Sequence, residues 1–236
     1  MKQPSTSTDN QKFIFTGEHQ ESDGNTVWRI RRRDSVVLGG WLAGEGNLSA
    51  DGSCWVADNA IVSGGARVGG SAQVYGDAVV YGGYVGGNAA VFGDAEIHGG
   101  TIEGNARVHG EAVIYGELIY GNAEVCGSAW VFSSAKIYEN CIVRGGDISG
   151  DVVIRGVAEI NSGKLKEGEY TAGVYDQGES PYESLESLAE KIQNHNNRVG
   201  TWGTGSSSEE GHKHQEDLRG IQAKRENVIE VKFSKK

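Results

Sequence analysis

Residues 68–84 read VGGSAQVYGDAVVYGGY, and residues 85–101 read VGGNAAVFGDAEIHGGT. The second segment repeats the aliphatic residues, alanines and glycines of the first after 17 positions, and the pattern continues to residue 131. Within each unit, aliphatic residues recur every six positions, with an occasional five. A fixed period of this kind indicates a repeat architecture in which successive units stack.

Residues one period apart form columns of nearly constant chemistry, three of them aliphatic and two of them alanine. The aliphatic columns are Val68/Val85/Ile102/Ile119, Val74/Val91/Val108/Val125/Ile142 and Val80/Ile97/Ile114/Val131/Ile148, and the alanine columns are Ala72/Ala89/Ala106/Ala123 and Ala78/Ala95/Ala112/Ala129. Each alanine column lies two positions before an aliphatic one, and residues two apart in a strand share a face. Three short strands per turn around such an interior predict an all-β, single-stranded parallel β-helix.

Glycine followed by Asp, Asn or Glu marks the corners, as in Gly76-Asp77, Gly87-Asn88 and Gly93-Asp94. Glycine adopts positive φ without steric cost, and Asn and Asp tolerate it better than most residues. A flat antiparallel sheet of hairpins is the alternative. It would show apolar–polar alternation without a 17-residue register, so we prefer the β-helix.

The repeat predicts about six coils over residues 56–165, which at ~4.8 Å per strand layer gives a prism ~29 Å tall. Each coil contacts only its neighbours, so both ends need covers. Residues 12–55 are expected to form an N-terminal cap with a hairpin, because residues 12–16 and 26–31 have strand character on either side of Asp23-Gly24-Asn25. Residues 1–11 are expected to form a flexible tail.

Beyond the repeat, residues 166–199 are expected to form a C-terminal helical segment. Ser180, Pro181 and Glu183 form a helix start signal, which predicts a helix over residues 181–195. Its apolar side chains share one face at helical spacing and should dock against something apolar. Residues 200–236 are expected to be a flexible linker and tail.

The composition of the chain argues against several classes of protein. The 236 residues include 37 Gly and 2 Pro, which without a three-residue period excludes collagen. The net charge of −10 disfavours nucleic acid as a partner, and we interpret Arg31-Arg32-Arg33 as a solvated or ion-paired face. No apolar run approaches the ~20 residues of a membrane span, and no secretory signal is visible, so a cytoplasmic location is expected.

The units Val74-Tyr75-Gly76-Asp77-Ala78 and Val91-Phe92-Gly93-Asp94-Ala95 resemble the hexapeptide repeat of left-handed β-helix proteins. Thr26-Val27-Trp28-Arg29-Ile30, leading to Gly39-Gly40-Trp41-Leu42 and Trp55-Val56, resembles the N-terminal signature of YdcK-like proteins, which are bacterial and prophage proteins labelled acyltransferases by fold analogy. The resemblance covers about residues 26–160. It implies a left-handed coil, a trimer packed side by side and, in the enzymes of the superfamily, acyl-CoA or sugar-linked substrates between protomers.

Two features depart from that superfamily. The coils have 17 residues where the common pattern has 18, and no long loop interrupts them to carry a catalytic histidine. His98 and His109 are the natural candidates for the general base of an acyltransferase. However, His98 falls in the outward column Tyr81/His98/Tyr115/Phe132, and His109 falls in Tyr75/Phe92/His109/Cys126. We therefore expect both histidines to stack in aromatic ladders.

The outward aromatics form two apolar stripes, larger than a monomer usually leaves open, and they are the predicted interaction surface. They are Tyr75, Tyr81, Phe92, Tyr115 and Phe132. Three covers are open at this point: the apolar face of the helix over residues 181–195, a second protomer or an external protein partner.

No metal site is expected. Cys54, Cys126 and Cys141 contain no C-x-x-C pair and are interpreted as reduced thiols, and two coil histidines are too few for the three-histidine zinc site of γ-type carbonic anhydrases. Asp77, Asp94 and Glu111 share a corner column that offers a hard cation a binding position, but screened turn residues are the preferred interpretation. His212-Lys213-His214 is interpreted as flexible polar sequence.

The sequence therefore favours a non-catalytic, oligomeric β-helix scaffold or interaction module without a cofactor, a trimer by preference. Such a protein is of a kind encoded by phages or prophages, in which case a virion location is the alternative to the cytoplasm. The alternative function is a CoA-dependent acyltransferase that uses acetyl-CoA or another acyl-CoA at a site between protomers, with His98 or His109 as base.

Overall fold

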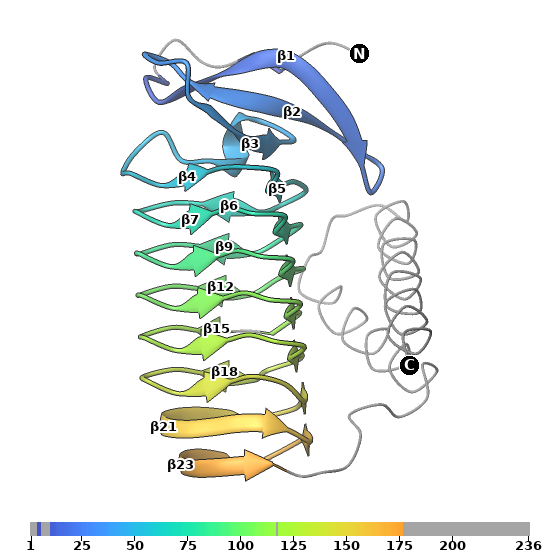
Figure 1. Cartoon of the computed structure of the whole chain (residues 1–236), viewed down its shortest axis with the longest axis vertical. Coiled ribbons are helices and arrows are strands. Elements are labelled where there is room, and N and C mark those ends of the chain that lie inside the picture. Colours follow the sequence, from blue (N-terminus) through green and yellow to red (C-terminus); the bar gives the residue numbers. More distant parts are fainter. Residues whose placement is uncertain (1–3, 6–9, 117, 177–236) are drawn as a thin grey trace, which may run out of the picture. The chain divides into compact units, whose positions relative to one another are not determined.

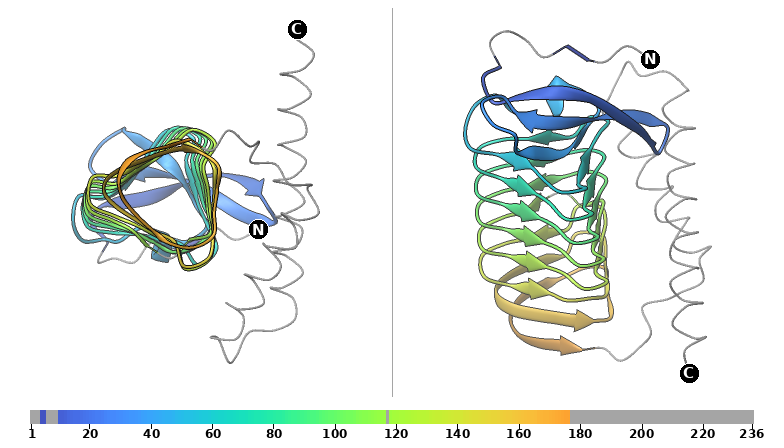
Figure 2. Two further views of the ribbon diagram at one scale, coloured as in Figure 1. Left: turned by 90° about the horizontal axis from the view of Figure 1, so that it is seen from below. Right: turned by 45° about the horizontal axis from the view of Figure 1, so that its top comes forward.

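The computed structural model describes residues 4–5, 10–116 and 118–176. In this part of the chain, short strands stack into an all-β parallel solenoid of about eight turns (Figure 1). Each turn has three sides, so that the turns superpose as a rounded triangle when viewed along the axis (Figure 2). The predicted fold class is confirmed.

The strands of successive turns form three faces. The first face contains β4 (Trp55–Val56), β7 (Gln73–Val74), β10 (Ala90–Val91), β13 (Arg107–Val108), β16 (Glu124–Val125) and β19 (Ile142–Val143). The second contains β5 (Ile61–Val62), β8 (Val79–Val80), β11 (Glu96–Ile97), β14 (Val113–Ile114), β17 (Trp130–Val131), β20 (Asp147–Ile148) and β22 (Lys164–Leu165). The third contains β6 (Arg67–Val68), β9 (Tyr84–Val85), β12 (Thr101–Ile102), β15 (Leu118–Ile119) and β18 (Lys136–Ile137).

Each two-residue strand places its second residue in the interior and its first residue outside. Val91, for example, is fully buried and pairs in register with Val74 and Val108 on the neighbouring turns. Ala89 and Ala106, two positions before these strands' inward valines, are also fully buried. The interior is thus filled by the stacked aliphatic and alanine columns that the sequence predicted.

One member of the predicted columns was wrong. The partner of Val125 on the next turn is Val143, and Ile142 instead pairs with Glu124 and lies half-buried outside. This turn is one residue longer than the 17-residue period, because the corner through Ser133 and Ser134 has one residue more than the equivalent corners of the three turns before it. A shift of one residue turns a strand side chain to the opposite face, so Val143 takes the interior position.

The predicted number of about six coils was also too low, since the solenoid extends beyond residues 56–165 at both ends. At the N-terminal end, β3 (Leu38–Leu42) already pairs in parallel with β5. At the other end, β21 (Val153–Ser162) runs along two faces and pairs in parallel with β23 (Glu169–Asp176). These outer turns lack the glycine–asparagine corners that made the central repeat visible.

The corners between the third and first faces need a left-handed backbone. Gly104 has φ +75°, and a Cβ there would lie 2.8 Å from the backbone nitrogen of Gly121. The equivalent position one turn beyond Gly121 is Glu139, with φ 67°, whose carboxylate accepts a hydrogen bond of 2.8 Å from the N–H of Gly156. The residues after these corners form an asparagine ladder, in which each Nδ2 donates to the next Oδ1: Asn88, Asn105, Asn122 and Asn140.

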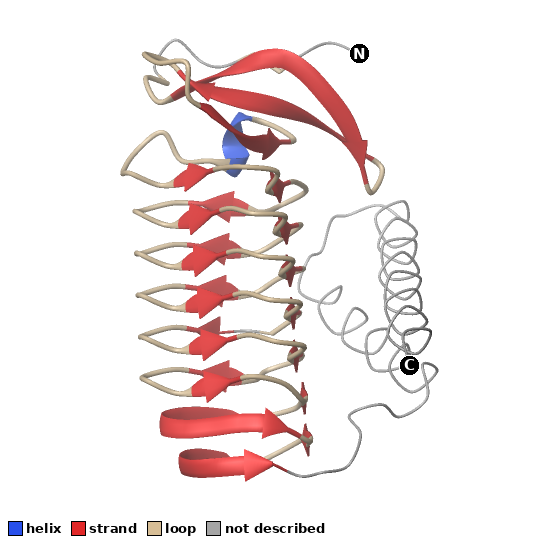
Figure 3. Ribbon diagram, in the orientation of Figure 1, coloured by secondary structure: helices blue, strands red, loops and turns tan. Residues whose placement is uncertain are grey.

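The predicted capping hairpin is confirmed. Strands β1 (Phe13–Ser22) and β2 (Asn25–Arg32) pair antiparallel, and β2 pairs antiparallel with β3, which begins the solenoid. Phe13 and Ile30 are fully buried within the continuous core. The described residues contain one helix, the short 3₁₀ element η1 (Glu45–Asn47) (Figure 3), and it is too short and polar to cross a membrane.

The basic run in β2 packs on tryptophan. The guanidinium of Arg29 lies 5.0 Å from the ring centroid of Trp41, and that of Arg32 lies 4.4 Å from the ring centroid of Trp55. These are cation–π distances. The helix predicted over residues 181–195 and the linker and tail predicted over residues 200–236 lie outside the described residues.

Candidate functional site

Two stacked rows of aromatic rings follow the solenoid axis. The first aromatic row is Tyr75, Phe92 and His109, at the end of the first face. The ring centroids of Tyr75 and Phe92 are 4.9 Å apart with an interplanar angle of 1°, and those of Phe92 and His109 are 4.5 Å apart at 9°. The guanidinium of Arg107 lies 5.2 Å from the Phe92 centroid.

The second aromatic row is Tyr81, His98, Tyr115 and Phe132, at the end of the second face. Successive centroids are 4.8, 4.2 and 5.7 Å apart, with interplanar angles of 24° or less. The predicted stacking of both coil histidines is therefore confirmed. In each row, the repeat sets the separation of the rings, because equivalent residues of adjacent turns are separated by one strand spacing.

Three members of the second row, His98, Tyr115 and Phe132, are buried although their side chains point away from the interior, and Tyr81 is half-buried. Phe132 is 1% exposed and Tyr115 is 3% exposed, yet neither belongs to the internal core cluster. Val113 and Trp130, at outward positions of β14 and β17, are likewise buried outside that cluster. The outer side of the second face is therefore a packing surface.

Burial also sets the charge of His98. Loss of hydration lowers the pKa of its imidazole below the ordinary value, and the hydrogen bond and negative charge of Glu96 oppose that shift only in part. The Nε2 of His98 lies 3.5 Å from a carboxylate oxygen of Glu96. His98 is therefore neutral in the folded protein near neutral pH.

A third group of aromatic side chains, not predicted from the sequence, lies on the third face. Tyr120 and Tyr138 stack with centroids 5.1 Å apart, and the ring of Tyr84 fills the space that side chains at Gly69 and Gly86 would need. Tyr84 and Tyr120 are among the exposed large side chains. The signal was weak because Gly86 and Glu103 interrupt the column that leads to Tyr120.

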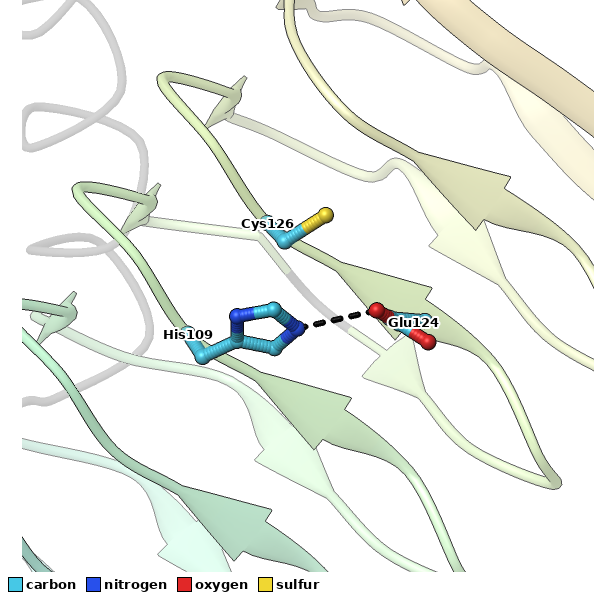
Figure 4. A group of neighbouring side chains, drawn as sticks. All are labelled: His109, Glu124 and Cys126. Atoms are coloured by element: carbon cyan, nitrogen blue, oxygen red, sulfur yellow. Dashed lines mark hydrogen bonds and ion pairs between the residues drawn. The ribbon is translucent and has the colours of Figure 1, made fainter.

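On the first face, His109, Glu124 and Cys126 come together on two successive turns (Figure 4). His109 follows β13, Glu124 is the outward residue of β16, and Cys126 follows β16. The Nε2 of His109 and the Oε1 of Glu124 are 2.9 Å apart, and one ligand atom from each of the three side chains lies within 4.8 Å of the others. All three side chains are partly exposed.

The Cys126 thiol is held protonated by its surroundings. Loss of hydration raises its pKa above the ordinary value, the carboxylate of Glu124 raises it further, and the positive charge of Arg144 opposes both. The charge of Arg144 is itself engaged, because its guanidinium donates to Glu159 at 2.7 Å and to Asn161 at 3.2 Å. Cys126 is therefore a protonated thiol at neutral pH.

The sequence contained the information for this cluster. His109 and Cys126 share an outward column, and Glu124 lies two positions before Cys126, which places all three on one face. A search for C-x-x-C pairs and histidine triplets misses a ligand set that is distributed over two turns. The corner carboxylates of Asp77, Asp94 and Glu111, in contrast, do not form a ligand cluster in the part of the chain that the structure describes.

Comparison with known proteins identifies no family. No protein-family model matches the chain, and no curated protein matches it either. The function must be inferred from the site itself.

Proposed function

We propose that this protein is a non-catalytic β-solenoid scaffold that assembles with copies of itself, as a trimer, through the second aromatic row. The observation that supports this is the regular stack of outward aromatic rings on the second face. It is apolar, runs over several turns and presents rings at regular spacing. Flat aromatic surfaces of this kind contribute strongly to protein–protein interfaces, because they bury a large area at low cost in side-chain entropy.

The resemblance to left-handed hexapeptide-repeat proteins, including the YdcK-like ones, supports the same proposal. Side-by-side packing of coils in trimers is what that resemblance implies. We also propose that the solenoid is left-handed. We further propose that the protein is of phage or prophage type and is located in the cytoplasm or the virion.

Light scattering of the full chain tests the assembly. We expect the wild type to have the mass of three chains and the combined variant Tyr81→Ser, Tyr115→Ser, Phe132→Ser to have the mass of one. The matched control, Tyr84→Ser, Tyr120→Ser, Tyr138→Ser, removes three aromatic side chains from another face and should leave the mass unchanged. A monomeric wild type, or a variant that keeps its mass, would show that this row is not the contact.

A second function is favoured by one observation, the contact between His109 and Glu124. A carboxylate that orients an imidazole is the arrangement of a general base, so His109 is the better candidate for the acyltransferase alternative than the buried His98. Calorimetric titration with acetyl-CoA tests it. The acyltransferase requires heat of binding that is lost in His109→Ala, and absence of heat at millimolar ligand would exclude it.

A further inference from the structure

We propose that His109, Glu124 and Cys126 bind a divalent transition-metal ion of the zinc type on the outer side of the first face, and that the ion joins two successive turns of the solenoid.

The donor set fits such an ion. Imidazole nitrogen, thiolate sulfur and carboxylate oxygen are the three ligand types that zinc takes in proteins. With Cys126 and Glu124 both negative and His109 neutral, the ligands balance the two positive charges of the ion. A hard cation such as Ca²⁺ or Mg²⁺ would not choose a thiolate and an imidazole.

The geometry is close to that of a bound site. Ligand atoms around a tetrahedral ion with zinc bond lengths are separated by about 3.5 Å. The Nε2 of His109 and the Oε1 of Glu124 are 2.9 Å apart, and all three ligand atoms lie within 4.8 Å of one another, so the separations differ from the ideal value by little more than about 1 Å. Rotation of the partly exposed Glu124 and Cys126 side chains closes that difference without a change in the backbone.

The surroundings leave the ligands accessible. Arg107 lies opposite Glu124 in the strand register, but its guanidinium is placed over the Phe92 ring. Arg144 follows Cys126 in the same column and is held by Glu159. The stack on Phe92 holds the imidazole plane of His109, as outer contacts orient the ligands of metal sites.

The site has three protein ligands and faces solvent, so a water molecule completes the coordination. When the ion binds, the hydrogen bond between His109 and Glu124 is replaced by two bonds to the metal. The Cys126 thiol gives up its proton to solvent, and His109 binds the ion through Nε2 in the tautomer that carries the ring proton on Nδ1. The ion would stabilise the folded chain, because three ligands from two turns converge only in the solenoid.

Cobalt(II) is the probe that isolates this site from the rest of the chain. Titrated into the full-length protein under a non-chelating reductant, it should give a sulfur-to-metal charge-transfer band that saturates at one ion per chain. The band reports a cysteine ligand, so weak binding by His212 and His214 does not contribute to it. Zinc added afterwards should abolish the band by displacement.

Variants assign the ligands. Cys126→Ser should abolish the band, and His109→Ala and Glu124→Gln should each weaken zinc binding by at least about 100-fold, since loss of a mere outer-shell contact costs about 10–100-fold. Cys141→Ala is the matched control. Cys141 is fully buried in the interior column that otherwise holds alanine, so this variant should keep both the fold and the band.

A second readout does not depend on spectroscopy. Zinc should raise the midpoint of thermal unfolding of the wild type and of Cys141→Ala but not of Cys126→Ser. The proposal is wrong if no charge-transfer band forms at saturating cobalt, or if the band persists in Cys126→Ser. Neither result depends on the assembly through the second face, so this site and the proposed scaffold function fail or succeed separately.

Discussion

His98 makes the free energy of unfolding depend on pH. Its pKa is lowered in the folded protein, mainly by burial, whereas in the unfolded chain it has the ordinary value near 6.5. Below that value the unfolded state binds a proton that the folded state excludes. The free energy of unfolding should therefore fall as the pH drops below about 6.5, with a slope of up to about 1.4 kcal/mol per pH unit from this group.

The variant His98→Tyr tests this contribution of His98, because tyrosine matches the neighbouring rings of the row and is uncharged between about pH 5.5 and about pH 7.5. Urea unfolding at about pH 7.5 and about pH 5.5 should show a smaller loss of stability in the variant than in the wild type, with a difference of at most about 1.4 kcal/mol. If both proteins lose the same amount, the pKa of His98 is not lowered by folding.

Single residues also show where the sequence was sufficient and where it was not. The stacking of His98 and His109 was predictable, because an outward column fixes the ring spacing. The interior position of Val143, in place of the predicted Ile142, was not predictable. One added residue in a corner leaves no mark on the composition, and both side chains are aliphatic. To predict the cluster of His109, Glu124 and Cys126, the outward positions within and directly after β16 had to be considered together with the preceding turn.

At the level of structural elements, the asparagine ladder links successive turns along one corner. Asn105 takes part in two ladder hydrogen bonds, from Asn88 at 3.1 Å and to Asn122 at 2.9 Å. Asn88 takes part in one ladder hydrogen bond, which it donates to Asn105. A hydrogen bond of this kind contributes about 0.5–1.5 kcal/mol, with exposed ones at the lower end.

Asn105→Ala should therefore lower the free energy of unfolding by about 1–2 kcal/mol, and Asn88→Ala by about half of that. Chemical denaturation of the two variants and the wild type measures both values. Equal losses would show that the ladder bonds are not additive and that the corner backbone, rather than the amide side chains, holds the turns together.

The elements were predicted best where corner chemistry repeats. The turn Asp23-Gly24 identified the capping hairpin, and the Gly–Asn corners identified the central turns. Strand β23 was assigned to a helical segment, because Glu169 to Asp176 are largely polar or exposed at the end of the solenoid and carry no aliphatic column of their own. Its strand conformation depends on pairing with β21, which only the folded chain provides.

For the whole molecule, the repeated core means that the solenoid can be shortened by whole turns. Each turn contacts its neighbours alone, so stability is a sum of contributions from adjacent turns. Deletion of residues 88–104, one full 17-residue unit, joins Gly87 to Asn105 and keeps every column in register. We expect a folded protein that is shorter by about 4.8 Å and less stable than the wild type.

The control deletion, residues 88–103, removes one residue less. It separates the inward residues Val85 and Val108 by seven positions, whereas the inward residues of the repeat are six or five positions apart, so the strand that follows turns interior side chains toward solvent. Circular dichroism and small-angle X-ray scattering should show a folded, shortened particle for the first deletion and an unfolded or aggregated one for the second. If the two deletions behave alike, the register is not what specifies the fold.

The capping hairpin decides how far such molecules can join end to end. Filament growth needs a strand edge at each end that accepts another molecule. At the N-terminal end, the outer strand β1 is interrupted by a register shift between Phe15 and His19 and carries the exposed charges of Glu18 and Glu21, features that block edge pairing. Joining through β23 would leave a cap at both outer ends, so axial growth stops at two molecules.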